Sequence, residues 1–235
     1  MPQHSEAHHQ QASGRYLADV ILGANDGLVT TFAVVAGASG AQLPAFVVVV
    51  LGLANLLADG LSMGLGNYLG QKSEVDYQRR QRRREEDEVR HLPDVETEEV
   101  KTVFRQWGFA GKLLNEATGV ITADPKRWVD FMMREELGVI ENHPASPGRR
   151  GFATFIAFVT IGLLPLLPFL IGWHGPAAVM GSVAITGVAL FSVGASRSAI
   201  TIQKWYWGGL QMLLVGGTAA AVAFLVGFFI ERLVG

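Results

Sequence analysis

Cysteine is absent from the 235-residue chain, which excludes disulfides, thiolate metal sites and cysteine nucleophiles. Charge is also scarce, because charged residues make up 17% of the sequence against about 25% in ordinary soluble domains. A net charge of −2 and an isoelectric point near 6.3 leave no basic footprint for nucleic acid. The sequence offers no nucleophile–base pair, phosphate-binding loop or metal-hydrolase spacing, which argues against an enzyme.

Long apolar runs are abundant instead, and hydrophobic residues make up 49% of the sequence. Five runs reach the roughly 20 residues that a helix needs to cross about 30 Å of hydrocarbon. They predict an all-α polytopic membrane protein with five transmembrane helices. The runs are residues 17–40, 44–70, 151–173, 176–196 and 207–231.

Most of the charge is concentrated between the second and third runs, where residues 74–143 hold 16 of the 21 acidic residues. This shift in composition predicts a helical insert between two groups of membrane helices. We expect a flexible tail at 1–14, transmembrane helices at 15–73, the insert at 74–148 and transmembrane helices at 149–235. The tail has no signal-peptide pattern.

Basic residues set the expected orientation, because Lys and Arg near the ends of spans stay on the cytoplasmic side. With the N-terminus inside, the cytoplasmic segments hold 18 of the 19 basic residues, and only Arg232 lies outside. The N-terminus and the 74–148 insert are therefore expected to be cytosolic. The short loops favour a bacterial inner membrane, and a vacuolar membrane also fits.

Helix signals divide the insert. Neither Gly nor Pro interrupts residues 72–91, so the second span should continue as one helix until Pro93 ends it. Asp124 and Pro125 predict a cap and a first helical residue. Further helices are predicted at 95–107 and 125–139, with a shorter turn or helix around 112–119.

Polar side chains inside the apolar runs are the main functional candidates, since a charged residue at a helix centre costs about 2.5–3.5 kcal/mol. Two carboxylates share one face of the first span, and a polar stripe recurs every fourth residue in the second. The predicted transport pathway is Asp19, Asp26, Asn55, Asp59, Met63 and Asn67. The alternative is that Asp26 only bonds a neighbouring helix and that Met63 faces lipid.

The ligand types of this stripe indicate a metal. Carboxylate and amide oxygens suit hard divalent cations, whereas the thioether of Met63 favours a transition metal. Asp26 and Met63 are therefore the predicted metal ligands within the membrane. Because a proton and a metal would compete for Asp26, the same carboxylate meets the physical requirement for exchange transport.

Carboxylates at helical spacing also recur in the insert, where pairs three residues apart share a helix face and repel each other. A bound cation would reverse that repulsion. The predicted metal ligands are Glu85, Glu88, Glu96, Glu99, Met132, Met133 and Glu136. A solvated acidic face, with the two methionines in a core, is the alternative.

Small residues and prolines shape the membrane helices. Pro165 and Pro168 remove helical hydrogen bonds and predict a break in the third span. Four glycines of the second span permit close approach between helices, and they suggest a dimer seam. They are Gly60, Gly64, Gly66 and Gly70.

Taken together, these residues resemble the vacuolar iron transporter family over the stretch from Asp19 to the fifth span. The motifs that carry the resemblance are DGLVTTFAVVAGASGA (Asp26–Ala41), SMGLGNYLGQKSE (Ser62–Glu74), PDVETEEV (Pro93–Val100), WVDFMMREELG (Trp128–Gly138) and PLLP in the third span. The resemblance implies a homodimer of five-span protomers, with the pathway between the two copies of spans one and two. It also implies a cytosolic metal-binding domain of three helices fed by the extended second span.

The resemblance further implies export of Fe²⁺, and in many members Mn²⁺, from the cytosol in exchange for protons. By position, Asp26 and Met63 correspond to pathway residues, and Asp19 lies nearer the cytosolic mouth. One departure stands out, because Asn55 replaces a glutamate of plant-type members while Asp59 replaces a small residue one turn later. The acidic function has moved along the stripe, or the proton coupling differs.

The leading hypothesis is therefore a metal/proton antiporter whose acidic insert captures Fe²⁺ or Mn²⁺, with no prosthetic group. Oxygen and thioether ligands also accept Zn²⁺ and Co²⁺, and the affinity for these ions follows the Irving–Williams order. A membrane-anchored metal buffer or sensor, in which the insert does the work, is one alternative. A passive metal channel is another, and proton coupling separates it from the antiporter.

Overall fold

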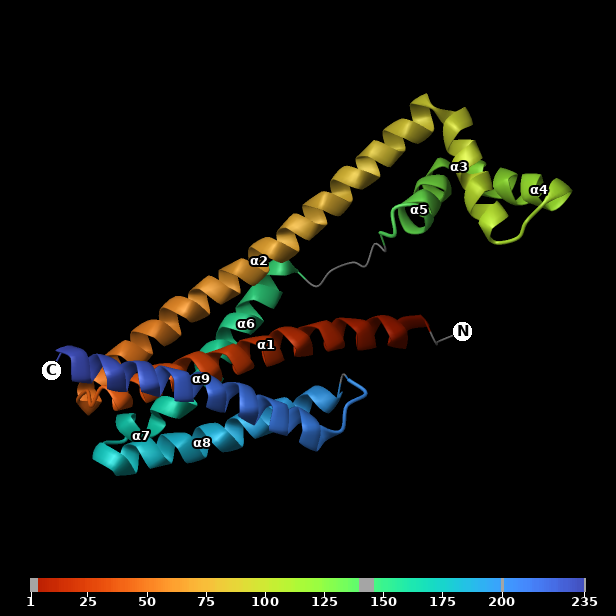
Figure 1. Cartoon of the computed structure of the whole chain (residues 1–235). Helices are drawn as coiled ribbons and strands as arrows, with labels where there is room; N and C mark the ends of the chain where they lie inside the picture. Colours follow the sequence, from red (N-terminus) through yellow and green to blue (C-terminus); the bar gives the residue numbers. More distant parts are fainter. Residues whose placement is uncertain (1–3, 140–145, 200, 235) are drawn as a thin grey trace. The chain divides into compact units, whose positions relative to one another are not determined.

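The computed structural model describes residues 4–139, 146–199 and 201–234, with side chains from residue 16 onward except at 199 (Figure 1). All regular elements in these ranges are helices. They are α1 (His4–Gly40), α2 (Ala45–His91), α3 (Pro93–Gln106), α4 (Gly111–Thr122), α5 (Pro125–Glu135), α6 (Pro147–Gly162), η1 (Leu164–Leu166), α7 (Leu167–Leu170), α8 (Gly175–Ser196), η2 (Arg197–Ala199) and α9 (Trp205–Val234). The predicted flexible tail at 1–14 lies in a part of the chain whose side chains are not described, so it stays a prediction.

Five segments are long and apolar enough to cross a membrane, so the chain is a multi-pass membrane protein. They agree with the five runs in the sequence to within a few residues, apart from the continuation of the second into a longer helix. They are Tyr16–Gly40, Ala45–His91, Pro147–Leu170, Gly175–Ser196 and Trp205–Val234.

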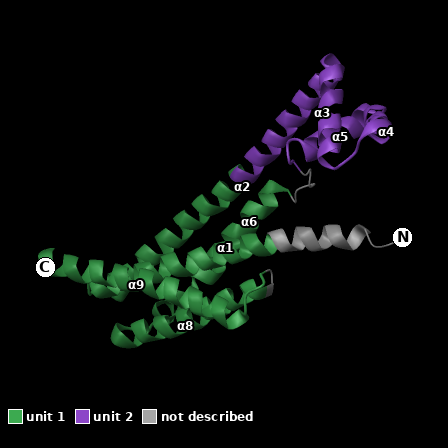
Figure 2. Cartoon of the chain, turned by 45° about the vertical axis from the view of Figure 1, so that its right-hand side comes forward, with its two compact units in different colours: residues 1–69, 145–235 green, residues 70–144 purple. Residues whose placement is uncertain are grey.

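The chain divides into two compact units (Figure 2). Unit 1 comprises residues 1–69 and 145–235, and unit 2 comprises residues 70–144. Helix α2 runs through both units, because nothing interrupts it before Pro93, as predicted. Its apolar part ends near Leu69, and 13 of the 20 residues at 72–91 are charged. That charged part lies outside the hydrocarbon on energetic grounds.

Helix α1 packs in unit 1 with its backbone directly against two neighbours. A Cβ at Gly27 would lie 2.4 Å from the carbonyl oxygen of Phe158 on α6. A Cβ at Gly227 of α9 would lie 2.0 Å from the carbonyl oxygen of Gly37 on α1. Only glycine allows such an approach, so small residues fix where α1 meets α6 and α9.

Two of the glycines predicted to form a dimer seam are used within the chain. A Cβ at Gly64 would lie 2.9 Å from the carbonyl oxygen of Gly151 on α6, and one at Gly60 would lie 3.2 Å from the Phe158 ring. The seam prediction is therefore wrong for Gly60 and Gly64, because α6 occupies their place. Gly66 and Gly70 face open space, so their part in a seam stays a prediction.

The predicted break in the third span is confirmed. Helix α6 ends at Gly162, and the chain passes through the short elements η1 and α7 before Gly175 begins α8. Pro165 supplies no backbone N–H, which interrupts the helical bonding. The Ser182 hydroxyl of α8 donates to the carbonyl oxygen of Pro165 at 2.7 Å, so one exposed backbone acceptor is satisfied inside the bundle.

Unit 2 consists of the charged end of α2 together with α3, α4 and α5. The Asp124 carboxylate accepts from the backbone N–H of Arg127 at 2.9 Å, with Pro125 first in the helix, as predicted. Helix α4 is a full helix rather than a short turn, and α5 ends at Glu135, four residues before the predicted position. The apolar core is Val89, Val100, Phe104, Leu114, Trp128, Val129, Phe131, Met132 and Met133.

Candidate functional site

Three glutamates of unit 2 converge from three helices. Glu85 lies on the charged part of α2, Glu96 lies in the first turn of α3, and Glu136 caps the C-terminus of α5. Only Leu92 separates the end of α2 from Pro93, the first residue of α3, and this short connection brings Glu96 towards Glu85. One carboxylate oxygen from each residue lies within 4.8 Å of the other two.

The inner two members of this triad, Glu85 and Glu96, are almost fully buried. Glu85 is 3% exposed and Glu96 is 4% exposed. Glu85 Oε1 and Glu96 Oε2 have no hydrogen-bond partner among the described residues. Buried acceptors of this kind are costly, so the arrangement calls for a proton or a cation.

The electrostatics of the triad point the same way. Burial raises the pKa of Glu85 to about 8, and the neighbouring carboxylate of Glu96 adds to the shift. Burial also raises the pKa of Glu96, with a further contribution from Glu99. The pKa of Glu136 is raised by burial first and then by Glu99. All three shifts favour the protonated form of the metal-free site, so a metal would have to compete with protons for these carboxylates.

Glu88 and Glu99, the other predicted glutamate ligands, lie around the triad. Both contribute repulsion at Glu96 and at Glu136. Glu88 also accepts a hydrogen bond from Arg84 Nε at 3.0 Å, so it is partly neutralised. The structure thus brings all five predicted glutamates into one electrostatic neighbourhood, with three of them close enough to share an ion.

Met132 and Met133, also predicted as ligands, are 0% and 1% exposed. Both belong to the apolar core of unit 2, where they pack with residues such as Val100 and Phe104. This environment agrees with the packing alternative, and a ligand role for either sulfur stays a prediction. Three carboxylates alone already offer the oxygen set that Mn²⁺, Fe²⁺ and other divalent cations accept.

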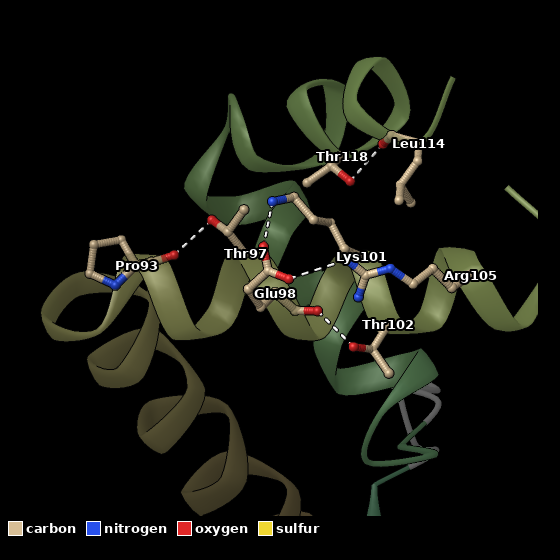
Figure 3. Close-up of polar contacts among 8 residues, drawn as sticks. All are labelled: Pro93, Thr97, Glu98, Lys101, Thr102, Arg105, Leu114 and Thr118. Carbon is tan, nitrogen blue, oxygen red and sulfur yellow. Dashed lines mark hydrogen bonds and ion pairs between the residues drawn. The ribbon is translucent and has the colours of Figure 1, made fainter. Parts of the chain in front are cut away.

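An exposed glutamate of α3 provides the contrast (Figure 3). The carboxylate of Glu98 forms ion pairs with Lys101 and Arg105, which follow it on the same helix. Hydrogen bonds from these two cations lower its pKa. Within one helix, therefore, Glu98 is paired and exposed, whereas Glu96 is buried among carboxylates.

The predicted membrane pathway lies in unit 1, on α1 and α2. Asp26 and Asp59 are near enough for their charges to repel each other. Asn25 Oδ1 and Asn55 Nδ2 are buried and have no hydrogen-bond partner among the described residues. The half-buried members of the pathway are Asp26, Asn55, Asp59, Met63 and Asn67. Two apolar helices thus hold a set of unsatisfied oxygen and nitrogen atoms near two carboxylates.

Asp19 is different, because it is 4% exposed and already has a cationic partner. Arg150 Nε donates to Asp19 Oδ2 at 2.6 Å, and Arg150 Nη2 donates to Asp19 Oδ1 at 3.0 Å. Asn67 Nδ2 donates to Asp19 Oδ1 at 3.1 Å. In the sequence, Arg150 is only one of the 18 basic residues on the expected cytoplasmic side, and no local pattern indicates a partner 131 residues away.

Comparison with known proteins finds one family over nearly the whole chain. The model of the VIT family matches residues 17–228. The chain is 36% identical to the vacuolar iron transporter of Centaurea cyanus over 216 residues, which cover 92% of this chain and 88% of that protein. It is 35% identical to vacuolar iron transporter 1 of Arabidopsis thaliana over 229 residues, covering 97% and 91%. It is 34% identical to the vacuolar iron transporter of Toxoplasma gondii over 237 residues, covering 97% and 78%.

Proposed function

Because the chain belongs to the VIT family, we propose that it moves Fe²⁺ out of the cytosol across its membrane in exchange for protons. The observation that carries the proposal is the neighbouring pair of carboxylates, Asp26 and Asp59, held on two helices apolar enough to span a membrane. Such groups are expensive in hydrocarbon, so their presence favours an ion pathway. Relatives across plants and an apicomplexan carry the name vacuolar iron transporter.

Within this pathway, Asp26 and Asp59 bind the metal, and Met63 one turn from Asp59 adds a thioether. The soft sulfur favours Fe²⁺ over Mg²⁺ and Ca²⁺, which prefer oxygen alone, while the two carboxylates also suit Mn²⁺. The unpartnered Asn25 Oδ1 supplies a further oxygen acceptor beside Asp26. Asn55, one turn before Asp59, extends the polar stripe along the same face of α2.

Proton exchange follows from competition at the carboxylates. A carboxylate that releases its metal into hydrocarbon surroundings is left as an unpaired charge, and a proton from the opposite side neutralises it. The protonated group then has less affinity for another metal until it faces the cytosol. After each metal is released, Asp26 and Asp59 can therefore bind protons and release them on the cytosolic side when the next metal binds.

The acidic triad of unit 2 captures metal before transport. Unit 2 is cytosolic in this proposal, because the basic residues beside the spans favour that side. Glu85, Glu96 and Glu136 hold the ion, while Glu88 and Glu99 increase the negative potential around it. A site whose ligands hold protons when empty takes up metal more strongly as the pH rises.

A second copy of the chain would complete the pathway. In one chain the stripe of Asn55, Asp59 and Met63 is only half-buried, and a polar stripe in contact with lipid is unfavourable. A homodimer through α1 and α2 would cover it and would place two sets of carboxylates opposite each other. Whether the membrane is a bacterial inner membrane or a vacuolar membrane does not change this mechanism.

The test is uptake by proteoliposomes with Fe²⁺ outside under reducing conditions, Mn²⁺ in a parallel series, and a pH dye inside. We expect metal entry accompanied by alkalinisation of the lumen, as protons leave in exchange. Metal entry without a pH change would indicate a passive channel. Tight metal binding without entry would indicate a membrane-anchored buffer or sensor instead.

A further inference from the structure

We propose that Arg150 is a tethered cation that closes the pathway at Asp19 and admits only ions of higher charge. This role rests on the proposed transport function, and it adds a specificity-determining residue to it. The guanidinium occupies the carboxylate that an entering metal would otherwise meet first. Arg150 is thus bound where the substrate must bind, and the substrate has to displace it.

The geometry of the pair supports this role. Two guanidinium nitrogens meet both oxygens of Asp19, at 2.6 and 3.0 Å. The side chains of Arg150 and Asp19 are only 13% and 6% exposed. A two-point, charge-assisted pair with so little water around it is strong and directional, unlike an exposed surface ion pair.

The surrounding contacts make the pair a junction of three helices. Asn67 of α2 donates both to Asp19 of α1 and to the Thr154 hydroxyl of α6, at 3.1 and 2.7 Å. Thr154 in turn donates to the backbone carbonyl of Arg150 at 3.1 Å. Asp19, Asn67 and Arg150 therefore hold α1, α2 and α6 together at one level.

This level lies at the end of the proposed pathway where the apolar part of α2 gives way to its charged part. Asn67 lies close to the end of the apolar part of α2, and Arg150 lies in the first turn of α6, where the chain returns from unit 2. Asp26 follows Asp19 by seven residues, which is about 10 Å further along α1. An ion that enters unit 1 at the level of Asn67 and moves along α1 towards Asp26 would pass the Asp19–Arg150 pair first.

The charge of the incoming ion decides whether it can open the pair. Coulomb attraction to Asp19 scales with ionic charge, so Na⁺ or K⁺ offers no more charge than the guanidinium that it must replace. A divalent ion offers twice that charge at the same carboxylate. Arg150 therefore excludes monovalent cations without any narrow filter.

The experiment uses the full-length protein in liposomes and compares Arg150→Gln with Arg150→Lys. Mn²⁺ uptake gives KM and kcat, and K⁺ efflux from loaded vesicles gives the monovalent leak. Arg149→Gln is the matched control, because Arg149 is the neighbouring exposed arginine. Asp19→Asn combined with Arg150→Gln serves as a second variant with no buried unpaired charge.

For Arg150→Gln we expect the KM for Mn²⁺ to fall about tenfold, the scale on which one desolvated charge pair acts, and kcat to fall because the freed Asp19 retains the ion. K⁺ efflux should appear in this variant. Arg150→Lys should keep K⁺ excluded, since the charge remains, and the double variant should leak K⁺ without the fall in KM.

A purely structural role predicts a lower melting temperature with unchanged KM and no K⁺ efflux, and that result overturns the inference while leaving metal transport intact. If Arg150→Gln does not fold, K⁺ exclusion by the double variant would overturn it equally. Absence of Mn²⁺ and Fe²⁺ uptake by the unaltered protein would instead overturn the proposed function, and this role with it.

Discussion

The two units of the molecule treat buried carboxylates in opposite ways. In unit 1, Asp19 is buried with the guanidinium of Arg150 bound to both of its oxygens. In unit 2, Glu85 and Glu96 are buried beside Glu136, and the inner oxygens of Glu85 and Glu96 have no hydrogen-bond partner among the described residues. The first arrangement supplies its own cation, whereas the second must obtain a proton or a cation from solution.

This difference separates stability from binding. A buried carboxylate that is paired with an internal cation is already neutralised, and removing its partner would leave an uncompensated buried charge, so a ligand must compete with that cation. A cluster of unpaired carboxylates is destabilising when empty, so a bound metal gains both its own attraction and the relief of repulsion. This criterion supports the two proposals that the triad of unit 2 captures metal and that the paired Asp19 acts as a barrier.

The largest effect is expected at Asp26, the half-buried carboxylate of α1 that lies near Asp59 of α2. Asp26→Asn should lower metal uptake by more than about 100-fold, because even outer-shell changes at metal sites cost 10–100-fold. Met63→Ala should have a similar effect. Proteoliposome flux is the measurement, with Glu231→Gln near the end of α9 as the control. Normal flux in both variants would remove Asp26 and Met63 from the pathway.

The next largest effect is expected when the triad loses one charge. Glu85→Gln should weaken Mn²⁺ binding by the intact protein about 10- to 100-fold, as measured by calorimetry. The same change should stabilise unit 2 without metal, since it relieves repulsion with Glu96. Glu98→Gln is the matched control on α3, because Glu98 is exposed and paired with Lys101 and Arg105. Equal affinities for the two variants would show that the triad holds no metal.

Particular residues show how far the sequence predicts this fold. Pro93 and Pro165 were sufficient to predict the end of α2 and the break after α6, because proline acts on its own helix. Glu85, Glu96 and Glu136 were predicted as members of an acidic site from their helical spacing and from family resemblance. The number of carboxylates that meet in one triad depends on how α2, α3 and α5 pack, which local spacing does not encode.

Two other features could not be predicted from the sequence, because they also depend on how the helices pack. The partner of Asp19 is Arg150, 131 residues away, and only the packing of α1 against α6 brings them together. Gly60 and Gly64 indicated a close helix contact, but a small-residue motif does not specify which helix approaches. In this chain α6 takes that place, because Gly151 presents backbone to Gly64.

An intermediate effect is expected from pH in unit 2. Because the pKa of Glu85 rises from its ordinary 4.5 to about 8, the folded state holds a proton that the unfolded state has released between these values. The stability of metal-free unit 2 therefore falls as the pH rises from about 5 to about 8, between the two pKa values. Glu98 and Asp124, whose pKa values are lowered, stay ionised in this window and contribute no opposing change.

Hydrogen exchange of the intact protein measures this effect by region. Protection of residues 85–136, corrected for intrinsic rates, should decrease over that pH range without metal, and it should be restored by Mn²⁺ most strongly at the higher pH. Glu85→Gln should flatten the pH dependence. Protection that increases with pH in the metal-free protein would contradict the raised pKa values.

The smallest effect is expected at the peripheral cation of the triad. Arg84 is exposed and is paired with Glu88 at 3.0 Å, so it neutralises the cluster only from its edge. Arg84→Met should strengthen Mn²⁺ binding by no more than about twofold, because exposed ion pairs contribute little. We compare this small gain in Mn²⁺ affinity with the roughly tenfold fall in KM expected for Arg150→Gln. The comparison shows how much burial strengthens the effect of an arginine on metal binding. A large gain would mean that unit 2 also regulates its site with an internal cation.

The most direct measurement of the contrast between the units is a crystal structure of the protein soaked in Mn²⁺, with ions located by anomalous scattering. We predict one ion coordinated by oxygens of Glu85, Glu96 and Glu136, a second ion beside Asp26 and Asp59, and none at Asp19 while Arg150 is bonded to it. An ion at Asp19 with the arginine still in place, or a triad without an ion, would contradict the account.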